Sequence, residues 1–280
     1  MLNEGNRLSY MNTTSGNGWV STTNGPLTAE VRCESWNAFI DFIHSENAVN
    51  LSDAYCFRGH ASENWQLKST LKRSLELNSA SYLPSAEKDI LDSFKNYCLG
   101  RRGHNPAQLT ENEWWALGQH FGLKTPLLDW TESPYVAAYF AFNTEYHETE
   151  NVAVWMLAKN INTYPEISRL APNHHLDFLR PYLDENARLL NQRGLFVRTP
   201  EMMCVSDWIA QFHQSGHIAL AKVLIPAVEK KRVLSSLDKM NINHLTLFPD
   251  LMGAAEYANF KLNESLSYSI LPSPVPPATV

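Results

Sequence analysis

The 280-residue sequence lacks the features that mark a membrane or secreted protein. It contains no apolar run near the roughly 20 residues that a membrane-spanning helix needs. Its N-terminus has no basic segment followed by an apolar core, so we predict no secretory signal peptide. The formal net charge is -6, which argues against a broad basic surface for nucleic acid but leaves room for a local basic groove. We therefore expect a cytoplasmic protein without membrane contact.

The sequence is also poor in cysteine and in short catalytic or metal-binding motifs. Its four cysteines are scattered without a CxxC pair, so buried thiols in a reducing compartment explain them best. No glycine-rich dinucleotide fingerprint, Walker loop or GxSxG sequence is present. His213 and His217 have helical spacing, but Gly216 intervenes and no glutamate lies between them, so they form no zinc-protease motif. We predict no metal site.

The chain does have enough apolar material for a substantial core. Hydrophobic residues make up 44% and aromatic residues 11%, which suits one large domain or two small ones. Helical patterns dominate the first half and strand patterns the second, without the regular alternation of a doubly wound sheet. We predict an α+β fold with helices packed around small mixed or antiparallel sheets. It forms one domain at residues 30–262, between a disordered leader at 1–29 and a flexible proline-rich tail at 263–280.

Apolar periodicity and capping residues divide this domain into helices and strands. Helices are predicted at residues 35–44, 85–99, 110–122, 134–142, 184–192, 227–240 and 250–262. Strands are predicted at residues 53–59, 151–159, 195–198, 219–225 and 245–248, with an irregular segment at 164–183. Thr110 has capping-box spacing to Glu113, and Ser133 followed by Pro134 is a good helix start.

The stretch from residue 118 to 142 combines polar, reactive side chains with a buried helix. Asp129 and Thr131 come just ahead of the helix N-terminus, where free N–H groups favour anions. One interpretation is a loop that lines a pocket for a phosphate-bearing ligand. The other is that Asp129 caps the turn or pairs with an arginine, and spacing alone favours this one. Trp130 is expected in the core.

Three blocks of the sequence together resemble the FRG domain, a family named for its Phe/Tyr-Arg-Gly signature. They are Phe57-Arg58-Gly59 with Trp65, Leu67, Ser69, Leu71 and Arg73; Gln119-His120-Phe121-Gly122 with Thr125 and Leu127-Leu128-Asp129-Trp130-Thr131; and Asn186, Arg188, Gln192, Gly194 and Phe196. Phe248-Pro249-Asp250-Leu251 closes the resemblance, which spans residues 35–257. The chain departs from the family at His60, where a glutamine-like residue is usual, and at Pro126, where an arginine is common.

The resemblance implies a fold distantly similar to that of ADP-ribosyltransferases, which use NAD as a substrate. Such an enzyme would modify a protein or nucleic acid, in a bacterial defence or toxin setting. The resemblance assigns dinucleotide binding to Arg58, Gly59, Asp129, Thr131 and Arg188, and catalytic roles to His120, Thr125 and Gln192. Gln192 is not acidic and cannot stabilise a developing positive charge. The later acids to inspect are Glu185, Glu201 and Glu256.

The residues themselves leave other interpretations open. Arg58 either clamps a phosphate or pairs with Asp129 and locks two blocks together. His120 is either a general acid or base or a histidine stabilised at a helix C-terminus. The same pocket also suits a non-enzymatic module that binds a nucleotide, a nucleic acid or a partner protein. A third interpretation is that Arg58, Asp129 and Arg188 form one buried ion network that only specifies the fold.

Overall fold

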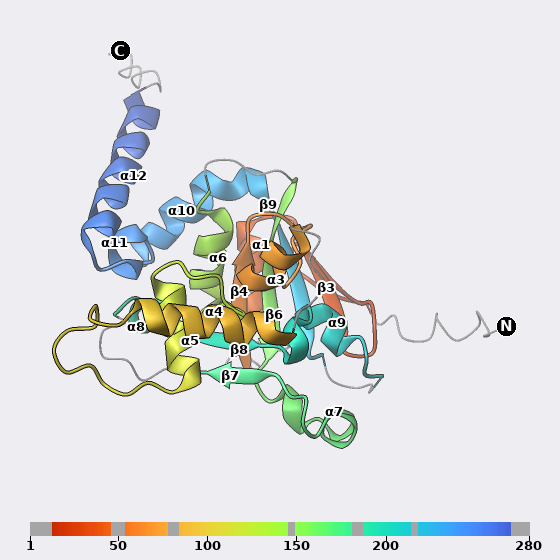
Figure 1. Cartoon of the computed structure of the whole chain (residues 1–280). Helices are drawn as coiled ribbons and strands as arrows, with labels where there is room; N and C mark the ends of the chain where they lie inside the picture. The colour runs from red at the N-terminus through yellow and green to blue at the C-terminus, as the bar shows by residue number, and fades with distance from the viewer. Residues whose placement is uncertain are drawn as a thin grey trace, which may run out of the picture.

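The computed structural model describes residues 13–45, 54–77, 84–144, 149–180, 187–213 and 218–269 (Figure 1). Their strands form one nine-stranded sheet in the order β1-β2-β3-β9-β6-β4-β5-β8-β7. The strands are β1 (Thr13–Gly16), β2 (Trp19–Thr23), β3 (Thr28–Cys33), β4 (Tyr55–His60), β5 (Leu127–Thr131), β6 (Asn151–Ala158), β7 (Asp177–Leu179), β8 (Gly194–Arg198) and β9 (Leu220–Pro226). β3 and β9 run parallel, and the other neighbours are antiparallel. The α+β prediction is confirmed, with the strands joined in one mixed sheet.

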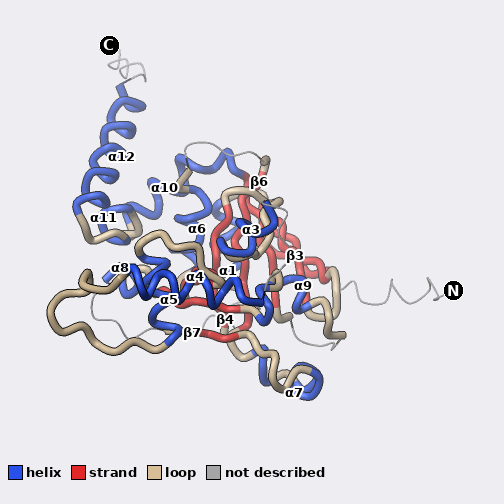
Figure 2. The backbone as a smooth tube through the Cα atoms, viewed as in Figure 1, coloured by secondary structure: helices blue, strands red, loops and turns tan. Residues whose placement is uncertain are grey.

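Helices lie around this sheet, as Figure 2 shows with strands in red and helices in blue. They are α1 (Trp36–His44), α3 (Thr70–Leu77), α4 (Pro84–Tyr97), α5 (Glu111–His120), α6 (Pro134–Phe142), α7 (Pro165–Leu170), α8 (Ala187–Asn191), α9 (Val205–Ile209), α10 (Lys230–Lys239), α11 (His244–Leu247) and α12 (Leu251–Ser269). α12 extends away from the body of the molecule (Figure 1). Within the described ranges, no helix is both long and apolar enough to cross a membrane.

Helix α6 is packed directly onto strand β4. Ser133 caps it by accepting a hydrogen bond from the Val136 N–H at 3.3 Å, and Pro134 begins it, as predicted. The helix is apolar on nearly every side, so most of its residues are buried. A Cβ atom on Gly59 would lie only 2.0 Å from the carbonyl oxygen of Ala137. The glycine of the Phe-Arg-Gly triplet is therefore required by the approach of the helix backbone.

The two faces of the central strands differ in polarity. Phe57 of β4 pairs with Met156 of β6, and both are buried on the side of the core. The next pair, Arg58 and Trp155, points to the opposite face because side chains alternate along a strand. Lys222 of β9 pairs with Trp155 and extends this second row. A cationic and aromatic row therefore crosses three adjacent strands.

Strands β4 and β5 are joined much less extensively than their neighbours. A single register pair, Phe57 with Thr131, connects them, whereas β4 and β6 share six. The two strands therefore separate near Arg58. An Arg58 Nη1–H donates to the backbone carbonyl of Asp129 across this separation.

Most predicted elements are confirmed, including the capping box at Thr110 and the buried position of Trp130. Two predictions are wrong. Residues 164–180 are not irregular, since they contain α7 and β7, and residues 181–183 lie outside the described ranges. Residues 245–248 form no strand, because Asn243 caps the short helix α11 by accepting from the Thr246 N–H at 3.0 Å. Gly194 begins β8.

The N-terminal leader was predicted too long. β1 and β2 form a hairpin within residues 13–23, and Trp19 is buried between β2 and α1. These strands are rich in Ser, Thr and Gly, so they lack the alternating apolar pattern that identifies a strand. At the other end, α12 continues to Ser269, beyond the predicted boundary at 262. Residues 1–12 and 270–280 lie outside the described ranges.

Replacement of Gly59 by alanine should destabilise the protein by about 3 kcal/mol, because the new methyl group would overlap the backbone of α6. Urea unfolding measures the change. Gly100→Ala is the matched control: Gly100 has φ 72°, but a methyl group added there would meet no atom within 4 Å, so only backbone strain of about 1 kcal/mol is expected. Equal losses in the two variants would contradict the packing role of Gly59.

Candidate functional site

Arg58 lies where β4 and β5 separate, and its side chain is only 18% exposed. Its Nε–H donates to Nε2 of His60 at 3.1 Å, and its Nη1–H donates to the carbonyl of Asp129. The Asp129 carboxylate is 3.8 Å from Nη1. Burial lowers the pKa of Arg58, and the Asp129 charge opposes this effect. Arg58 therefore pairs with Asp129, as one interpretation predicted, and connects the Phe57-Arg58-Gly59 block to the block that contains Asp129.

The carboxylate of Asp129 remains accessible, because the Asp129 side chain is 67% exposed. The Gln119 amide donates to Oδ1 of Asp129 at 2.7 Å. The amide oxygen of Gln119 in turn accepts from the hydroxyl of Thr125, which is fully buried. This chain of hydrogen bonds holds the carboxylate in a fixed orientation. Thr125 thus positions Gln119, and the catalytic role expected for it stays a prediction.

His60 is a neutral, buried partner of Arg58. It is 4% exposed, and Nδ1 lies 3.3 Å from the carbonyl oxygen of Trp65. Burial, together with the positive charges of Arg58, Arg73 and Lys222, lowers the pKa of His60 to about 3, and the contact with the Trp65 carbonyl opposes this effect. Nε2 accepts from Arg58, and Nδ1 faces both the Trp65 carbonyl and the indole N–H of Trp155, whose Nε1 lies 3.2 Å from it. His60 thus offers Arg58 an uncharged acceptor, as a glutamine at this position would.

The predicted residues Arg188 and His120 belong to a second group beside the first. Arg188 pairs with Asp250, with Nε 3.0 Å from Oδ2, and its guanidinium lies 5.4 Å from the ring centre of Phe248. His120 is exposed at the end of α5, next in sequence to Gln119. Burial and the nearby Arg188 lower the pKa of His120, and Asp250 opposes them. Arg188 therefore pairs with the carboxylate of Asp250, whereas Arg58 pairs with that of Asp129. The predicted single buried ion network of Arg58, Asp129 and Arg188 is wrong.

Three other predicted site residues hold elements together. The Gln192 amide donates to the Leu247 carbonyl at 3.1 Å, and the backbone carbonyl of Gln192 accepts from the hydroxyl of Thr131 at 2.7 Å. Thr131 is 4% exposed, and Gly59 faces α6. These contacts tie α8 to β5 and α11. Gln192, Thr131 and Gly59 therefore hold structural positions, and the catalytic and binding roles expected for them stay predictions.

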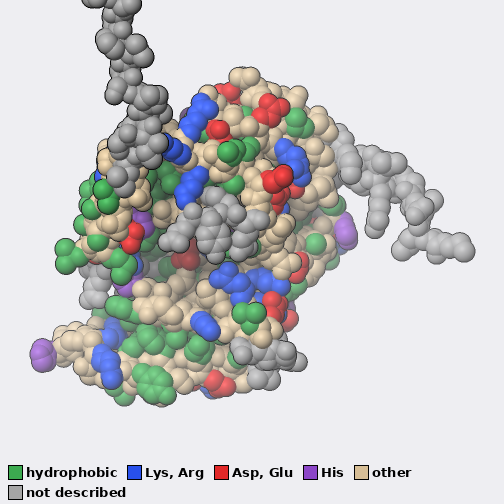
Figure 3. Space-filling model, turned by 90° about the horizontal axis from the view of Figure 1, so that it is seen from above, with side chains coloured by type: hydrophobic (Ala, Val, Ile, Leu, Met, Phe, Trp, Pro, Cys, Tyr) green, Lys and Arg blue, Asp and Glu red, His purple; other side chains and the backbone are tan. Residues whose placement is uncertain are grey.

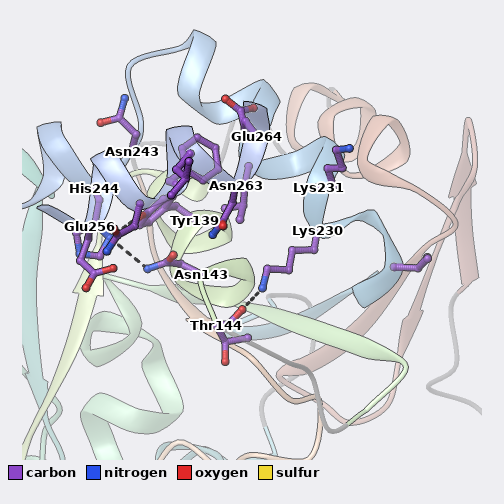
Figure 4. Close-up of a pocket in the computed structure, with 15 residues that line it drawn as sticks. Tyr139, Asn143, Thr144, Lys230, Lys231, Asn243, His244, Glu256, Asn263 and Glu264 are labelled. Carbon is purple, nitrogen blue, oxygen red and sulfur yellow. Dashed lines mark hydrogen bonds between the residues drawn. The ribbon is translucent and has the colours of Figure 1, made fainter. Parts of the chain in front are cut away.

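A groove whose lining does not include Arg58 or Asp129 lies between α6, α10, α11 and α12 (Figure 4). It has a volume of about 1130 Å³, and its polar lining includes Tyr139, Lys230, His244 and Glu256. Tyr139 and His244 share a hydrogen bond of 2.8 Å between the hydroxyl and Nδ1. The His244 ring also stacks on Phe248, with ring centres 4.4 Å apart. Through Phe248, the groove adjoins the Arg188–Asp250 pair.

His244 was not among the predicted site residues, because no motif surrounds it in the sequence. Of the three later acids, Glu256 lines this groove, whereas Glu201 lines a separate pocket of about 430 Å³ near Arg198. Glu185 lies outside the described ranges.

Across the part of the chain that the structure describes, no three His, Cys, Asp or Glu residues are grouped as a metal site would require. Cys33, Cys56, Cys98 and Cys204 are free thiols, and all but Cys98 are buried.

Comparison with known proteins supports one part of the resemblance. Residues 53–150 match the FRG domain family. This range contains the first two blocks and the groups around Arg58 and Asp129, whereas the third block and the closing segment lie beyond it. No curated protein and no solved structure matched the chain.

The buried His60 should make stability depend on pH. The unfolded chain takes up a proton near the ordinary pKa of 6.5, whereas folded His60 does so only near 3, so acid favours the unfolded state between these values. The slope is about 1.4 kcal/mol per pH unit. His60→Gln keeps an acceptor for Arg58 and removes the titration. Between pH 7 and pH 5, we expect the wild type to lose about 2 kcal/mol more unfolding free energy than this variant.

Urea unfolding at the two pH values measures this difference. Replacement of the exposed His213 by glutamine provides the matched control and should leave the pH dependence of the wild type unchanged. The interpretation of His60 as a neutral acceptor would be abandoned if His60→Gln and His213→Gln responded alike.

Proposed function

We propose that this FRG-domain protein binds NAD beside Arg58 and transfers its ADP-ribose group to an acceptor. The observation that carries the proposal is the juxtaposition of a largely buried guanidinium with an exposed, oriented carboxylate, Arg58 with Asp129. A dinucleotide requires a cation for its diphosphate, and glycosyl transfer requires an anion near the ribose. The two side chains offer both charges at the separation of β4 and β5.

Arg58 suits the diphosphate because its charge is only partly compensated. Within the described residues, Asp129 is its one ion-pair partner, at the long distance of 3.8 Å. The Nε and Nη1 donors are used by His60 and Asp129, and no hydrogen bond of Nη2 to a described residue is formed. Arg73 adds a second positive charge nearby and lowers the pKa of Arg58. An anionic ligand would therefore relieve repulsion as well as form hydrogen bonds.

Asp129 takes the role that was expected of Gln192. In the transfer, the bond between the ribose C1′ and the nicotinamide nitrogen breaks, and its electron pair leaves with nicotinamide. The carboxylate of Asp129 stabilises the oxocarbenium ion that remains. The nucleophile of the acceptor then forms a bond to C1′ and releases its proton. His120 accepts that proton, since its lowered pKa keeps it neutral at pH 7.

A second candidate is a module that binds the dinucleotide without catalysis. It is favoured by the position of Gln192, whose amide is engaged by the Leu247 carbonyl. It is also favoured by Glu256, which lines the separate groove and not the Arg58 site. The two candidates share the binding step and differ in the need for Asp129.

Isothermal titration with NAD tests the shared step. Arg58→Ala should weaken binding by about 10- to 100-fold, because charged hydrogen bonds contribute roughly 1.5–3 kcal/mol each. Arg58→Lys keeps the charge but not the planar donors, so we expect intermediate affinity. Arg169→Ala removes an exposed arginine of α7 and should bind as the wild type does. Equal NAD affinity in folded Arg58→Ala and wild type would contradict the proposed site.

Nicotinamide release from NAD separates the two candidates. Asp129→Asn should leave NAD affinity within a few-fold of the wild type but lower the rate of release by about 100-fold, because the stabilising charge is lost. A wild type that binds NAD without releasing nicotinamide, also when protein and nucleic-acid acceptors are present, would favour the binding module. Release that is unaffected by Asp129→Asn would contradict the catalytic role of Asp129.

A further inference from the structure

We infer that a surface around His60 binds single-stranded nucleic acid by combining base stacking with phosphate contacts. We call it the Trp65 surface, and it consists of Trp65, Trp155, Lys68, Lys72, Arg73 and Lys222. The inference concerns binding and does not require NAD. If the proposed transferase function holds, it identifies the class of acceptor.

The strand register builds one side of the Trp65 surface. Trp155 of β6 pairs with Arg58 of β4 and with Lys222 of β9, so all three side chains lie on one sheet face. This is the face opposite the one that packs against α6 at Gly59. The Lys222 ammonium lies 5.5 Å from the ring centre of Trp155, and both residues are partly exposed. A cation is thus held beside an aromatic ring at the surface.

Trp65 supplies a second ring at this position. It is 45% exposed, which is unusual for so large an aromatic side chain. Its ring centre lies 6.0 Å from that of His60, and its carbonyl oxygen lies 3.3 Å from Nδ1 of the same histidine. His60 also lies edge-on to Trp155, with ring centres 6.3 Å apart. Both tryptophans therefore pack against the same uncharged histidine, and Trp65 offers a ring on which an unpaired base can stack.

Positive charge surrounds these rings with little compensation. Lys68 and Lys72 share a single carboxylate, that of Glu76. Arg73 is exposed and forms no ion pair with any residue in the described ranges. Lys222 pairs with Trp155 in the strand register, and Arg73 follows Lys72 in α3. In a chain of net charge -6, Lys and Arg side chains nonetheless gather near the middle of the face in Figure 3.

A single strand fits this combination better than a duplex does. The bases of a duplex are stacked on each other and are not available to Trp65, whereas an unpaired base presents its face to an aromatic ring. Several cations spread over β9, α3 and the segment before α3 suit successive phosphates better than one isolated anion.

The test is fluorescence anisotropy of labelled oligonucleotides of about 12 nucleotides, oligo-dT and oligo-U, at several salt concentrations. We expect tighter binding to the single strands than to a blunt duplex of equal length. Trp65→Ala should weaken binding by at least about fivefold, and Trp65→Phe should retain most of it, because an exposed ring is replaced by another ring. Arg73→Gln should weaken binding and reduce the slope of log affinity against log salt by about 0.7.

Arg169→Gln, which removes an exposed arginine from α7, is the matched control and should leave affinity and slope unchanged. Absence of binding by the folded wild type at low salt would overturn the inference. So would tighter binding to the duplex, or equal affinities for Trp65→Ala and wild type. NAD titration of the same proteins keeps the two proposals apart, since Trp65→Ala and Arg73→Gln should lose oligonucleotide affinity even if the wild type fails to bind NAD.

Discussion

The close contact of α6 with β4 fixes where the chemistry of this protein lies. Gly59 has no side chain because the Ala137 carbonyl occupies the space where one would stand. The strand alternation then directs the flanking Arg58 and His60 to the opposite face. The same alternation brings Trp155 and Lys222 into line with Arg58. One backbone contact thus determines which face of the sheet is packed and which face carries cations and aromatic rings.

Arg58 is the charged group that this arrangement must accommodate. A guanidinium that is 18% exposed loses much of its hydration, and it is stabilised by the His60 ring and by the carbonyl and carboxylate of Asp129. His60 is suited to this task because burial keeps it neutral. Asp129 supplies the opposite charge but remains exposed. Gln119 donates to its carboxylate, and the buried Thr125 donates in turn to Gln119. The site therefore combines a rigid interior with a carboxylate that faces solvent.

The sequence revealed those elements whose signals are local. The cap at Ser133, the capping box at Thr110 and the apolar run of α6 each lie within a few residues, and all are confirmed. The hairpin of β1 and β2 was missed because these strands, at one end of the sheet, are held by backbone pairing and need few apolar residues. The roles of Gln192 and Thr131 were also hidden, because Gln192 bonds to Leu247, which is 55 residues away in sequence. Residue type and spacing identified the chemistry near Arg58 but not which side chains were already engaged.

The single register pair between β4 and β5 has a mechanical consequence. It divides the nine-stranded sheet into two wings. One wing has six strands, in the order β1, β2, β3, β9, β6 and β4, and the other has three, β5, β8 and β7. Few backbone hydrogen bonds oppose a change of twist between the wings. The Arg58 side chain connects them through its hydrogen bond to the Asp129 carbonyl. Any ligand that draws the guanidinium away from Asp129 acts on this connection. A ligand bound at Arg58 would therefore act on the relative twist of the two wings.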